Sequence, residues 1–582
     1  MKKLLYRVSC FVALALNGCG GDGGVGPGIE LPPGTTVEIA GGSGQQVVAG
    51  TAAPTPLQVE LLGPAGEPLP GILVRFTTTS VAAQLSPENA ITNDAGIAQT
   101  TLTPSPIVGT QTVTATVETL APVQFTVTVV PAPAAAMLPS GGDRQTGLQG
   151  QPFAAPLRVR INDAYGNAVS GVSVDWAVTQ GSGTLSAPSS VSGTDGLASV
   201  TLTPSSAGTI LVTASSAGLS GSPVTFQESV EMAVSLVATI PFTGYYHDQY
   251  IRDGIAFLSA WDNGLRIYDV GGGTLGGSPS NPKLIGSVVT AGGDVHNAWW
   301  YHAPDGQKRY VFVGQEGPGT VGVSSSGDIH VVDVGNMAAP VEVASYHVAG
   351  AGVHNFWVDE ANEILYAAYY NGGVVALDIS GTLSGDLAAR EIDRFVPGSP
   401  SSGYVWGVML YNGSLYASDM LRGFWQLRLV NGDFQVVSGG NNVPERFTSD
   451  LWIHGGYAYT GTWGSRMQPG NALKVWQLDA NGAPTLVNTI ITPGIGTVSD
   501  VEVSADGKLL MFSAENGSGS GLYFYDLTVS RSAPQLIGHY PAGGNSGVHT
   551  ATFAEIAGRR YVVATRNSPL GAIFLDVTAI GP

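Results

Sequence analysis

At 582 residues the chain is too long for one hydrophobic core, because such cores stop growing near roughly 250 to 300 residues, so several domains are expected. Its 81 Gly and 36 Pro, with only 12% charged residues, are typical of short strands joined by turns, and the composition predicts an all-β chain. The formal net charge of -19 argues against a nucleic-acid partner, which would require a basic face.

The first nineteen residues predict export. A basic start precedes a short apolar run at 8–16, which is too short to span a bilayer and indicates a signal peptide. The motif Leu16-x-Gly18-Cys19 resembles the lipobox of bacterial lipoproteins, and this resemblance implies that Cys19 is acylated as the first mature residue. The alternative is a plain secretory leader with an incidental cysteine. Residues 20–36 are rich in glycine and predict a flexible tether.

Residues 37–131 and 132–230 repeat one pattern. Pro56-Leu57 recurs as Pro156-Leu157, and Leu102-Thr103-Pro104 recurs as Leu202-Thr203-Pro204, each at an offset of 100 residues. Each copy contains about seven short strands separated by turn residues, which is the pattern of an immunoglobulin-like (Ig-like) sandwich.

Two motifs in the second copy suggest a family for these modules. They are D-x-x-G-N-x-V-x-G-V-x-V at 163–174 and D-G-x-A-x-x-T-L-T at 195–203. Both resemble the bacterial Ig-like domains of the invasin and intimin group, and the resemblance covers residues 37–230. Such modules are usually stalks, so the resemblance implies a spacer role, with direct adhesion by the sandwiches as the alternative.

A different domain is expected at 232–582, since all nine histidines and nine of the ten tryptophans follow residue 230. A unit recurs there with starts 45 to 58 residues apart, which predicts seven four-stranded blades. The starts are His247-Asp248, His296-Asn297, His354-Asn355, Tyr404-Val405, Ser449-Asp450, Ser499-Asp500 and His549-Thr550.

Strands such as GLRIYDV, DIHVVDV and AIFLDV resemble the LVIVD repeat family of bacterial propellers over residues 232–578. An extra strand at 235–242 precedes the first start, whereas the last unit lacks a fourth strand. We therefore expect the N-terminal strand to complete the seventh blade and remove an exposed edge. The predicted fold class is all-β, with two Ig-like β-sandwiches followed by a seven-bladed β-propeller.

The loops between second and third strands are expected on the same face as the unit starts. Aromatic and charged groups gathered at a channel mouth can orient a ligand. The candidate ligand-binding residues are Trp261, Asp262, Glu316, Tyr369, Asp419, Trp463, Arg466, Glu515 and Arg566.

Four histidines provide the one cofactor hypothesis, a transition metal at the propeller hub. His247, His296, His354 and His549 take equivalent positions in neighbouring blades, and imidazole suits zinc, copper, iron or nickel. The carboxylates of Asp248, Asp450 or Asp500 could ligate or support such an ion. In the competing interpretation each polar pair hydrogen-bonds the turn entering its strand, and strand alternation lets only one of each pair face the channel.

The sequence contains no phosphate-binding glycine loop, no nucleophile elbow and no zinc-protease helix motif. The leading hypothesis is therefore a non-enzymatic protein at the cell surface or outer membrane, held there by its lipid anchor alone. Its propeller would bind a glycan, protein or small-molecule ligand. Two alternatives stay open, namely a metal-dependent envelope enzyme and a scaffold for an envelope complex.

Overall fold

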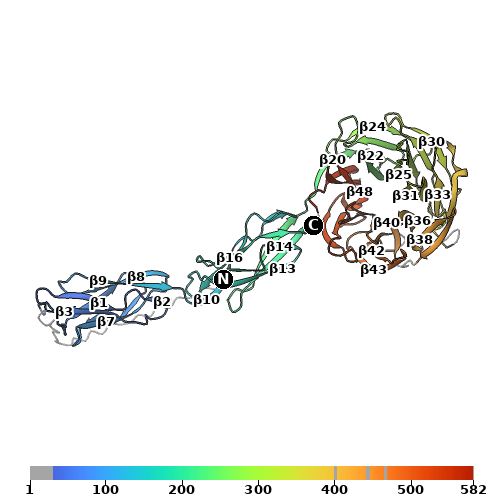
Figure 1. Cartoon of the computed structure of the whole chain (residues 1–582). Helices are drawn as coiled ribbons and strands as arrows, with labels where there is room; N and C mark the ends of the chain where they lie inside the picture. Colours follow the sequence, from blue (N-terminus) through green and yellow to red (C-terminus); the bar gives the residue numbers. More distant parts are fainter. Residues whose placement is uncertain (1–29, 399–402, 441–445, 465–467, 581–582) are drawn as a thin grey trace, which may run out of the picture.

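The computed structural model describes residues 30–398, 403–440, 446–464 and 468–580. The chain is all-β, as predicted, with two sandwiches in a row followed by a propeller (Figure 1). The leader and Cys19 lie outside the described residues. Among the helices of the described part, none has the length and apolar character needed to cross a membrane.

The first sandwich packs a four-stranded sheet, β1-β3-β7-β5, against a five-stranded sheet, β2-β9-β8-β4-β6. Its strands are β1 (Thr36–Gly41), β2 (Gln46–Val48), β3 (Leu57–Leu62), β4 (Leu73–Thr78), β5 (Gln84–Ser86), β6 (Asn89–Ile91), β7 (Ile97–Thr103), β8 (Gly109–Thr116) and β9 (Val123–Val130). Alternate side chains of these strands point inward, and Phe76 packs on Phe125 with ring centroids 6.3 Å apart.

The second sandwich repeats this arrangement with sheets β10-β12-β16 and β11-β19-β18-β13-β15 and a short β14-β17 pair. Its strands are β10 (Ala134–Gly141), β11 (Thr146–Leu148), β12 (Leu157–Asp163), β13 (Ser173–Gln180), β14 (Gly183–Leu185), β15 (Ser189–Val191), β16 (Leu197–Val200), β17 (Leu202–Pro204), β18 (Gly208–Ser215) and β19 (Val224–Glu231). Trp176 packs on Phe226 at 5.8 Å, in the place of the Phe76–Phe125 pair.

Asp163 and Asn167 tie the two sandwiches together. The Asp163 carboxylate accepts hydrogen bonds from the Ala132 backbone N–H and the Asn167 Nδ2, at 2.9 and 2.8 Å. Asn167 Nδ2 also donates to the carbonyl of Pro106 in the first sandwich, at 2.8 Å. In the first copy Gly63 and Glu67 take these two positions, so the side chains that form these bonds come from the second copy.

The propeller consists, within the described residues, of seven sheets arranged in a ring, each with four main antiparallel strands (Figure 1). From the channel outward the blades are β21 (Asp248–Arg252), β22 (Ile255–Ser259), β23 (Leu265–Asp269), β24 (Lys283–Val288); β25 (Val295–Trp300), β26 (Tyr310–Gln315), β29 (Ile329–Asp333), β30 (Val341–Tyr346); β31 (Phe356–Asp359), β32 (Ile364–Ala368), β33 (Val374–Asp378), β35 (Glu391–Phe395); β36 (Val405–Tyr411), β37 (Ser414–Asp419), β38 (Gly423–Val430), β39 (Asp433–Gly439); β40 (Phe447–His454), β41 (Tyr457–Trp463), β42 (Ala472–Leu478), β43 (Pro484–Ile491); β44 (Thr497–Val503), β45 (Leu509–Glu515), β46 (Gly521–Asp526), β47 (Gln535–Tyr540); and β48 (Val548–Ile556), β49 (Arg559–Asn567), β50 (Leu570–Asp576), β20 (Ser235–Pro241). Shorter elements are β27 (Gly317–Pro318), β28 (Ser325–Ser326), β34 (Gly385–Asp386), η1 (Ala388–Arg390) and η2 (Gly544–Ser546).

The N-terminal strand closes the ring as predicted. β20 pairs antiparallel with β50 and becomes the outer strand of the sheet that ends the chain. The last blade is thus assembled from both ends of the domain, which protects the β50 edge.

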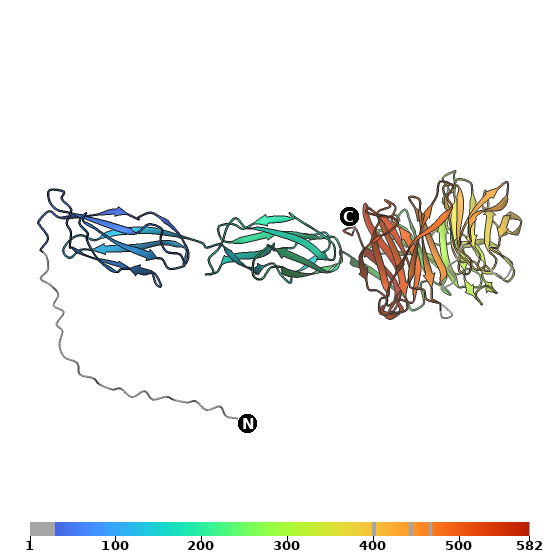
Figure 2. The ribbon, with the colours of Figure 1, turned by 90° about the horizontal axis from the view of Figure 1, so that it is seen from below.

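The rod of sandwiches meets the propeller at its rim (Figure 2). The Ala207 N–H of the second sandwich donates to the Ile537 carbonyl on outer strand β47, at 2.8 Å. Met232 packs against the propeller core beside Gly538. Because the junction lies on the rim, both ends of the central channel are left uncovered by the sandwiches.

Candidate functional site at the propeller hub

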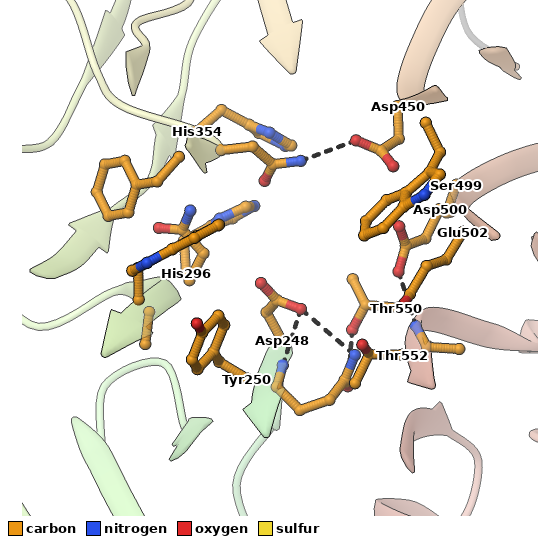
Figure 3. Close-up of a pocket in the computed structure, with 18 of the residues that line it drawn as sticks. Asp248, Tyr250, His296, His354, Asp450, Ser499, Asp500, Glu502, Thr550 and Thr552 are labelled. Carbon is orange, nitrogen blue, oxygen red and sulfur yellow. Dashed lines mark hydrogen bonds between the residues drawn. The ribbon is translucent and has the colours of Figure 1, made fainter. Parts of the chain in front are cut away.

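The innermost strands of all seven blades surround one cavity of about 310 Å³ (Figure 3). Equivalent residues of successive blades form stacked rings along it, so the cavity has a layered wall. We call the rings the histidine layer, the carboxylate layer and the aromatic collar. The histidine layer is His247, His296, His354 and His549. The carboxylate layer is Asp248, Asp450 and Asp500, and the aromatic collar is Tyr250, Trp299, Trp357 and Trp452.

Both members of the pair line this cavity in blades one, two, three, six and seven, so for these five blades the prediction that only one of each pair faces it is wrong, whereas in blade five Asp450 lines it and Ser449 does not. In blades two, six and seven the reason is a break in strand alternation at the pair. In blades two, five, six and seven the pairing with the second strand shifts register across the pair, as in a β-bulge, and the register skips His296 in blade two.

The fourth blade also corrects the alignment of the repeats. Its register shift falls between Val405 and Gly407, so Trp406 takes the place of the histidine, and not Tyr404. The Trp406 ring lies 4.1 Å from the His354 ring, the same separation as between His296 and His354.

The four predicted histidines come together. The ring centroids of His247 lie 4.1 Å from His296 and 4.2 Å from His549. Two loop-end carboxylates complete the layer. Glu316 Oε2 lies 3.5 Å from His247 Nε2, and Glu515 Oε1 lies 2.6 Å from His549 Nδ1.

The four imidazoles divide into two electrostatic states. Burial, with the neighbouring imidazoles, lowers the pKa of His247 and His296 well below the usual value, and burial lowers the pKa of His354 to about 3. Burial opposes protonation of His549 as well, but the Glu515 carboxylate outweighs it and raises the pKa of His549 to about 9. The layer therefore holds three neutral imidazoles beside one imidazolium–carboxylate pair at neutral pH.

An aromatic lid closes the loop-side end of the channel. Trp261 stacks on His247 with centroids 5.0 Å apart, and Tyr245 lies 6.3 Å from Trp261. On the opposite side Trp463 packs on Trp406 at 4.8 Å. The histidines below are at most 8% exposed.

The carboxylate layer lies on the other side of the histidines. Asp450 accepts a hydrogen bond from Asn355 Nδ2 at 3.0 Å and from the Val501 N–H at 3.3 Å, and Asp500 accepts from the Ala551 N–H at 2.8 Å. The bonds from Val501 and Ala551 join neighbouring blades and the bond from Asn355 joins blades three and five, so Asp450 and Asp500 have a structural role between blades.

Burial disfavours the ionised form of these carboxyl groups. It raises the pKa of Asp248 to about 7, with the Asp500 charge adding to the effect. Burial and the neighbouring Asp500 raise the pKa of Asp450 well above its usual value. The described residues lining the cavity include no Lys or Arg to balance them.

The aromatic collar surrounds the other end of the cavity. Tyr250, Trp299, Trp357 and Trp452 follow one another around the ring with centroids 5.2 to 6.2 Å apart. All four are half-buried, whereas the histidines are buried, so exposure rises from the histidine layer to the collar. The lining of the cavity includes all four collar residues but not Tyr245, Trp261 or Trp463 of the lid, so the cavity extends to the collar, on the face opposite the loops.

The predicted ligand-binding residues do not all ring the loop-side mouth. Trp261 and Trp463 lie in the lid, Asp262 is exposed in the loop beside it, and Glu316 and Glu515 lie buried in the histidine layer. Arg466 is outside the described residues.

Three of the predicted positions belong elsewhere. Tyr369 is 0% exposed in the core between blades, because its side chain points away from the channel and Tyr370 takes the inward position. Asp419 is also 0% exposed and holds its own loop by accepting the N–H groups of Leu421 and Arg422. Arg566 lines a separate groove with Tyr540 and donates to the Pro569 carbonyl at 2.8 Å.

The collar was missed from the sequence, although a signal for it exists. Its four aromatics each lie three residues after the first member of a polar pair, in blades one, two, three and five. Each aromatic also lies two residues after the second member of its pair, so strand alternation from that member places all four on the channel side.

Comparisons with known proteins divide the chain at the same place. The family "Bacterial Ig-like domain (group 1)" matches residues 42–130 and 154–228, and the family "LVIVD repeat" matches 247–290, 323–348 and 445–466. The curated protein "Inverse autotransporter adhesin YeeJ" of Escherichia coli (strain K12) is 31% identical over 173 residues. That match covers 28% of this chain and 7% of the adhesin, so the chain spans a small part of that relative's length.

Solved propellers align with the C-terminal part at low identity. The β-propeller domain of Cps50 (Swd1) from Myceliophteria thermophila is 11% identical, covering 59% of this chain and 100% of that domain, with a TM-score of 0.43. The C-terminal WD40 domain of Sif2 is 12% identical, covering 59% of this chain and 98% of that domain, with a TM-score of 0.39.

Proposed function

We propose that this protein is an exported, surface-displayed binding protein of adhesion type, whose propeller takes its ligand into the hub channel through the aromatic collar. The observation that carries the proposal is the cavity itself, which combines half-buried aromatic rings at its mouth with carboxyl groups inside. Aromatic faces stack on a flat ligand and carboxyl oxygens accept its hydrogen bonds, so the site suits a glycan end or a small polar molecule.

The sandwiches support the display part of the proposal. Their match to bacterial Ig-like domains, the similarity of part of the chain to part of an adhesin, and the tied junction at Asp163 and Asn167 suit a spacer that holds the propeller away from a membrane. Acylation at Cys19 would supply the anchor, and mass spectrometry of the protein extracted from membranes tests it.

Glycan and matrix-protein arrays probed with the chain from residue 20 onward test the binding function. Trp357→Ala, in the collar, should weaken binding by roughly 10- to 100-fold, as expected of an interface hot spot. Trp463→Ala, in the lid, tests the loop face, and Asn336→Ala, in an outer turn, is the matched control.

Binding that survives Trp357→Ala but is lost with Trp463→Ala would move the site to the loop face. Binding that is lost only on deletion of residues 37–230 would assign it to the sandwiches. A folded protein that binds nothing on either array would contradict the proposal and favour a scaffold in an envelope complex.

A further inference from the structure

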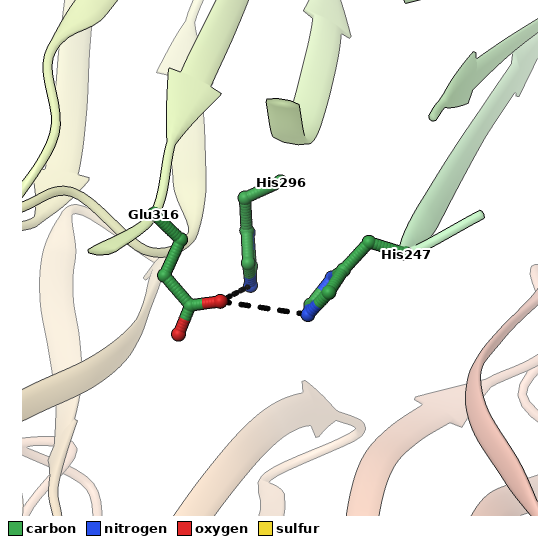
Figure 4. A group of neighbouring side chains, drawn as sticks. All are labelled: His247, His296 and Glu316. Carbon is green, nitrogen blue, oxygen red and sulfur yellow. Dashed lines mark ion pairs between the residues drawn. The ribbon is translucent and has the colours of Figure 1, made fainter. Parts of the chain in front are cut away.

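Two imidazoles and one carboxylate converge at the inner end of the hub channel (Figure 4). The Nε2 atoms of His247 and His296 lie 3.5 and 3.6 Å from the same oxygen, Glu316 Oε2. Across the described residues, these three form the one group of His, Cys, Asp or Glu whose ligand atoms all lie within 4.8 Å of one another.

These nitrogen–oxygen distances fit ligands that share one metal ion better than they fit direct hydrogen bonds. Nitrogen–oxygen hydrogen bonds are about 2.7–3.2 Å long, and both distances exceed that range. An ion held about 2.0–2.1 Å from tetrahedral ligands keeps those ligands about 3.3–3.4 Å from one another. The observed spacing leaves room for one such ion between the three atoms.

The nitrogens of these histidines lack other partners. His296 is 1% exposed and has no hydrogen-bond partner on either ring nitrogen, and His247 Nδ1 has none. An unsatisfied buried polar group destabilises the folded state, so folding alone does not favour keeping it. His330, 2% exposed, shows the contrast, because its Nδ1 bonds Glu342 at 2.8 Å.

The surrounding residues orient the three groups. The Tyr370 hydroxyl donates a hydrogen bond to Glu316 Oε1, which leaves Oε2 directed at the imidazoles. The other two histidines have other contacts. His549 Nδ1 hydrogen-bonds Glu515 at 2.6 Å, and the His354 ring packs between His296 and Trp406.

We propose that His247, His296 and Glu316 bind one first-row divalent transition-metal ion, which narrows the predicted four-histidine site to two histidines and a carboxylate. Two imidazoles with one carboxylate suit Zn²⁺ or Fe²⁺, and three protein ligands leave a coordination position for water or for a group entering from the cavity. The proposal is independent of what the channel binds.

The test uses the chain from residue 20 onward, stripped with a chelator and titrated separately with Co²⁺ and Zn²⁺. We expect saturation near one equivalent and a visible Co²⁺ absorption band, which reports the coordination geometry directly. His296→Ala and Glu316→Gln should each weaken binding by roughly 100-fold, and Tyr370→Phe by roughly 10-fold. His330→Ala, a buried histidine outside the group, should leave the titration unchanged.

Near-UV circular dichroism identifies any variant that does not fold, and the conservative Glu316→Gln replaces His296→Ala in that event. Absence of a Co²⁺ band at several equivalents would overturn the proposal, as would unchanged binding in a folded Glu316→Gln protein. Repeating the ligand arrays on metal-free protein separates this result from the binding function.

Discussion

The sandwiches and the propeller hub bury very different side chains. In the described part of the sandwiches the buried acidic residues are Asp163 and Glu228, and both accept backbone N–H groups, although Glu228 Oε1 has no partner. The hub buries four histidines with Glu316, Glu515, Asp450 and Glu502, and several of their polar atoms have no partner. Unsatisfied buried groups reduce stability, and in the hub they belong to histidines that surround one cavity, as expected of a region that retains groups for a ligand.

The largest effect should come from the sandwich core. Phe226→Ala removes a fully buried ring that packs on Trp176, and it should lower the free energy of unfolding of the second sandwich by about 3–5 kcal/mol. Differential scanning calorimetry should show one transition shifting to lower temperature while the propeller transition stays in place. A shift of the propeller transition as well would show that the rim junction couples the two units.

The second-largest effect on stability should come from removing the carboxylate partner of a hub histidine. Glu515→Gln leaves His549 without its carboxylate and should cost about 1–3 kcal/mol near pH 6. In the native protein the pKa of His549 is raised to about 9, so its contribution to stability is complete below about pH 6.5 and is lost as the pH rises through 9.

Denaturant titrations between pH 6 and 10 measure this dependence. The propeller of the native chain should lose stability across that interval, and the Glu515→Gln variant should show a flatter profile. An equally steep profile in the variant would assign the titration to another group.

A third substitution should raise the free energy of unfolding, whereas most substitutions of buried residues lower it. His296→Leu replaces two unpartnered ring nitrogens with an apolar side chain of similar size, so metal-free propeller should gain about 1 kcal/mol. The same substitution should abolish any stabilisation by Zn²⁺. Thermal melts with and without Zn²⁺ measure both, and a destabilised metal-free variant would mean that His296 contributes packing that leucine cannot replace.

The smallest effect concerns the junction between the sandwiches. Asn167→Ala removes its hydrogen bonds with the Pro106 carbonyl, the Asp163 carboxylate and the Val108 N–H, and should lower stability by about 1 kcal/mol, because each of these partly exposed bonds contributes little net. It should, however, make the angle between the two sandwiches more variable. Small-angle X-ray scattering should show a broader distribution of lengths, and an unchanged distribution would place the rigidity of the junction in other contacts.

The sequence alone determined the plan of the molecule. Repeats at fixed offset and alternating apolar residues specify sandwiches and blades, because each unit must bury one face of its own strands. The surplus strand at 235–242 likewise predicted closure of the ring, since an unpaired edge is unfavourable. The four histidines were found because equivalent positions in neighbouring blades must meet at the axis.

Only the tertiary structure decided which atoms meet in the hub. In blades two, six and seven, register shifts at the strand starts bring both members of the pair into the cavity, a change of side-chain direction that composition and spacing do not encode. Glu316 joins His247 and His296 from a loop at the end of β26, far from His247 in sequence, and Tyr370 directs it from the next blade. Such contacts depend on ring closure, which fixes distances between blades to within ångströms, whereas the sequence pattern fixes only the order of strands within each blade.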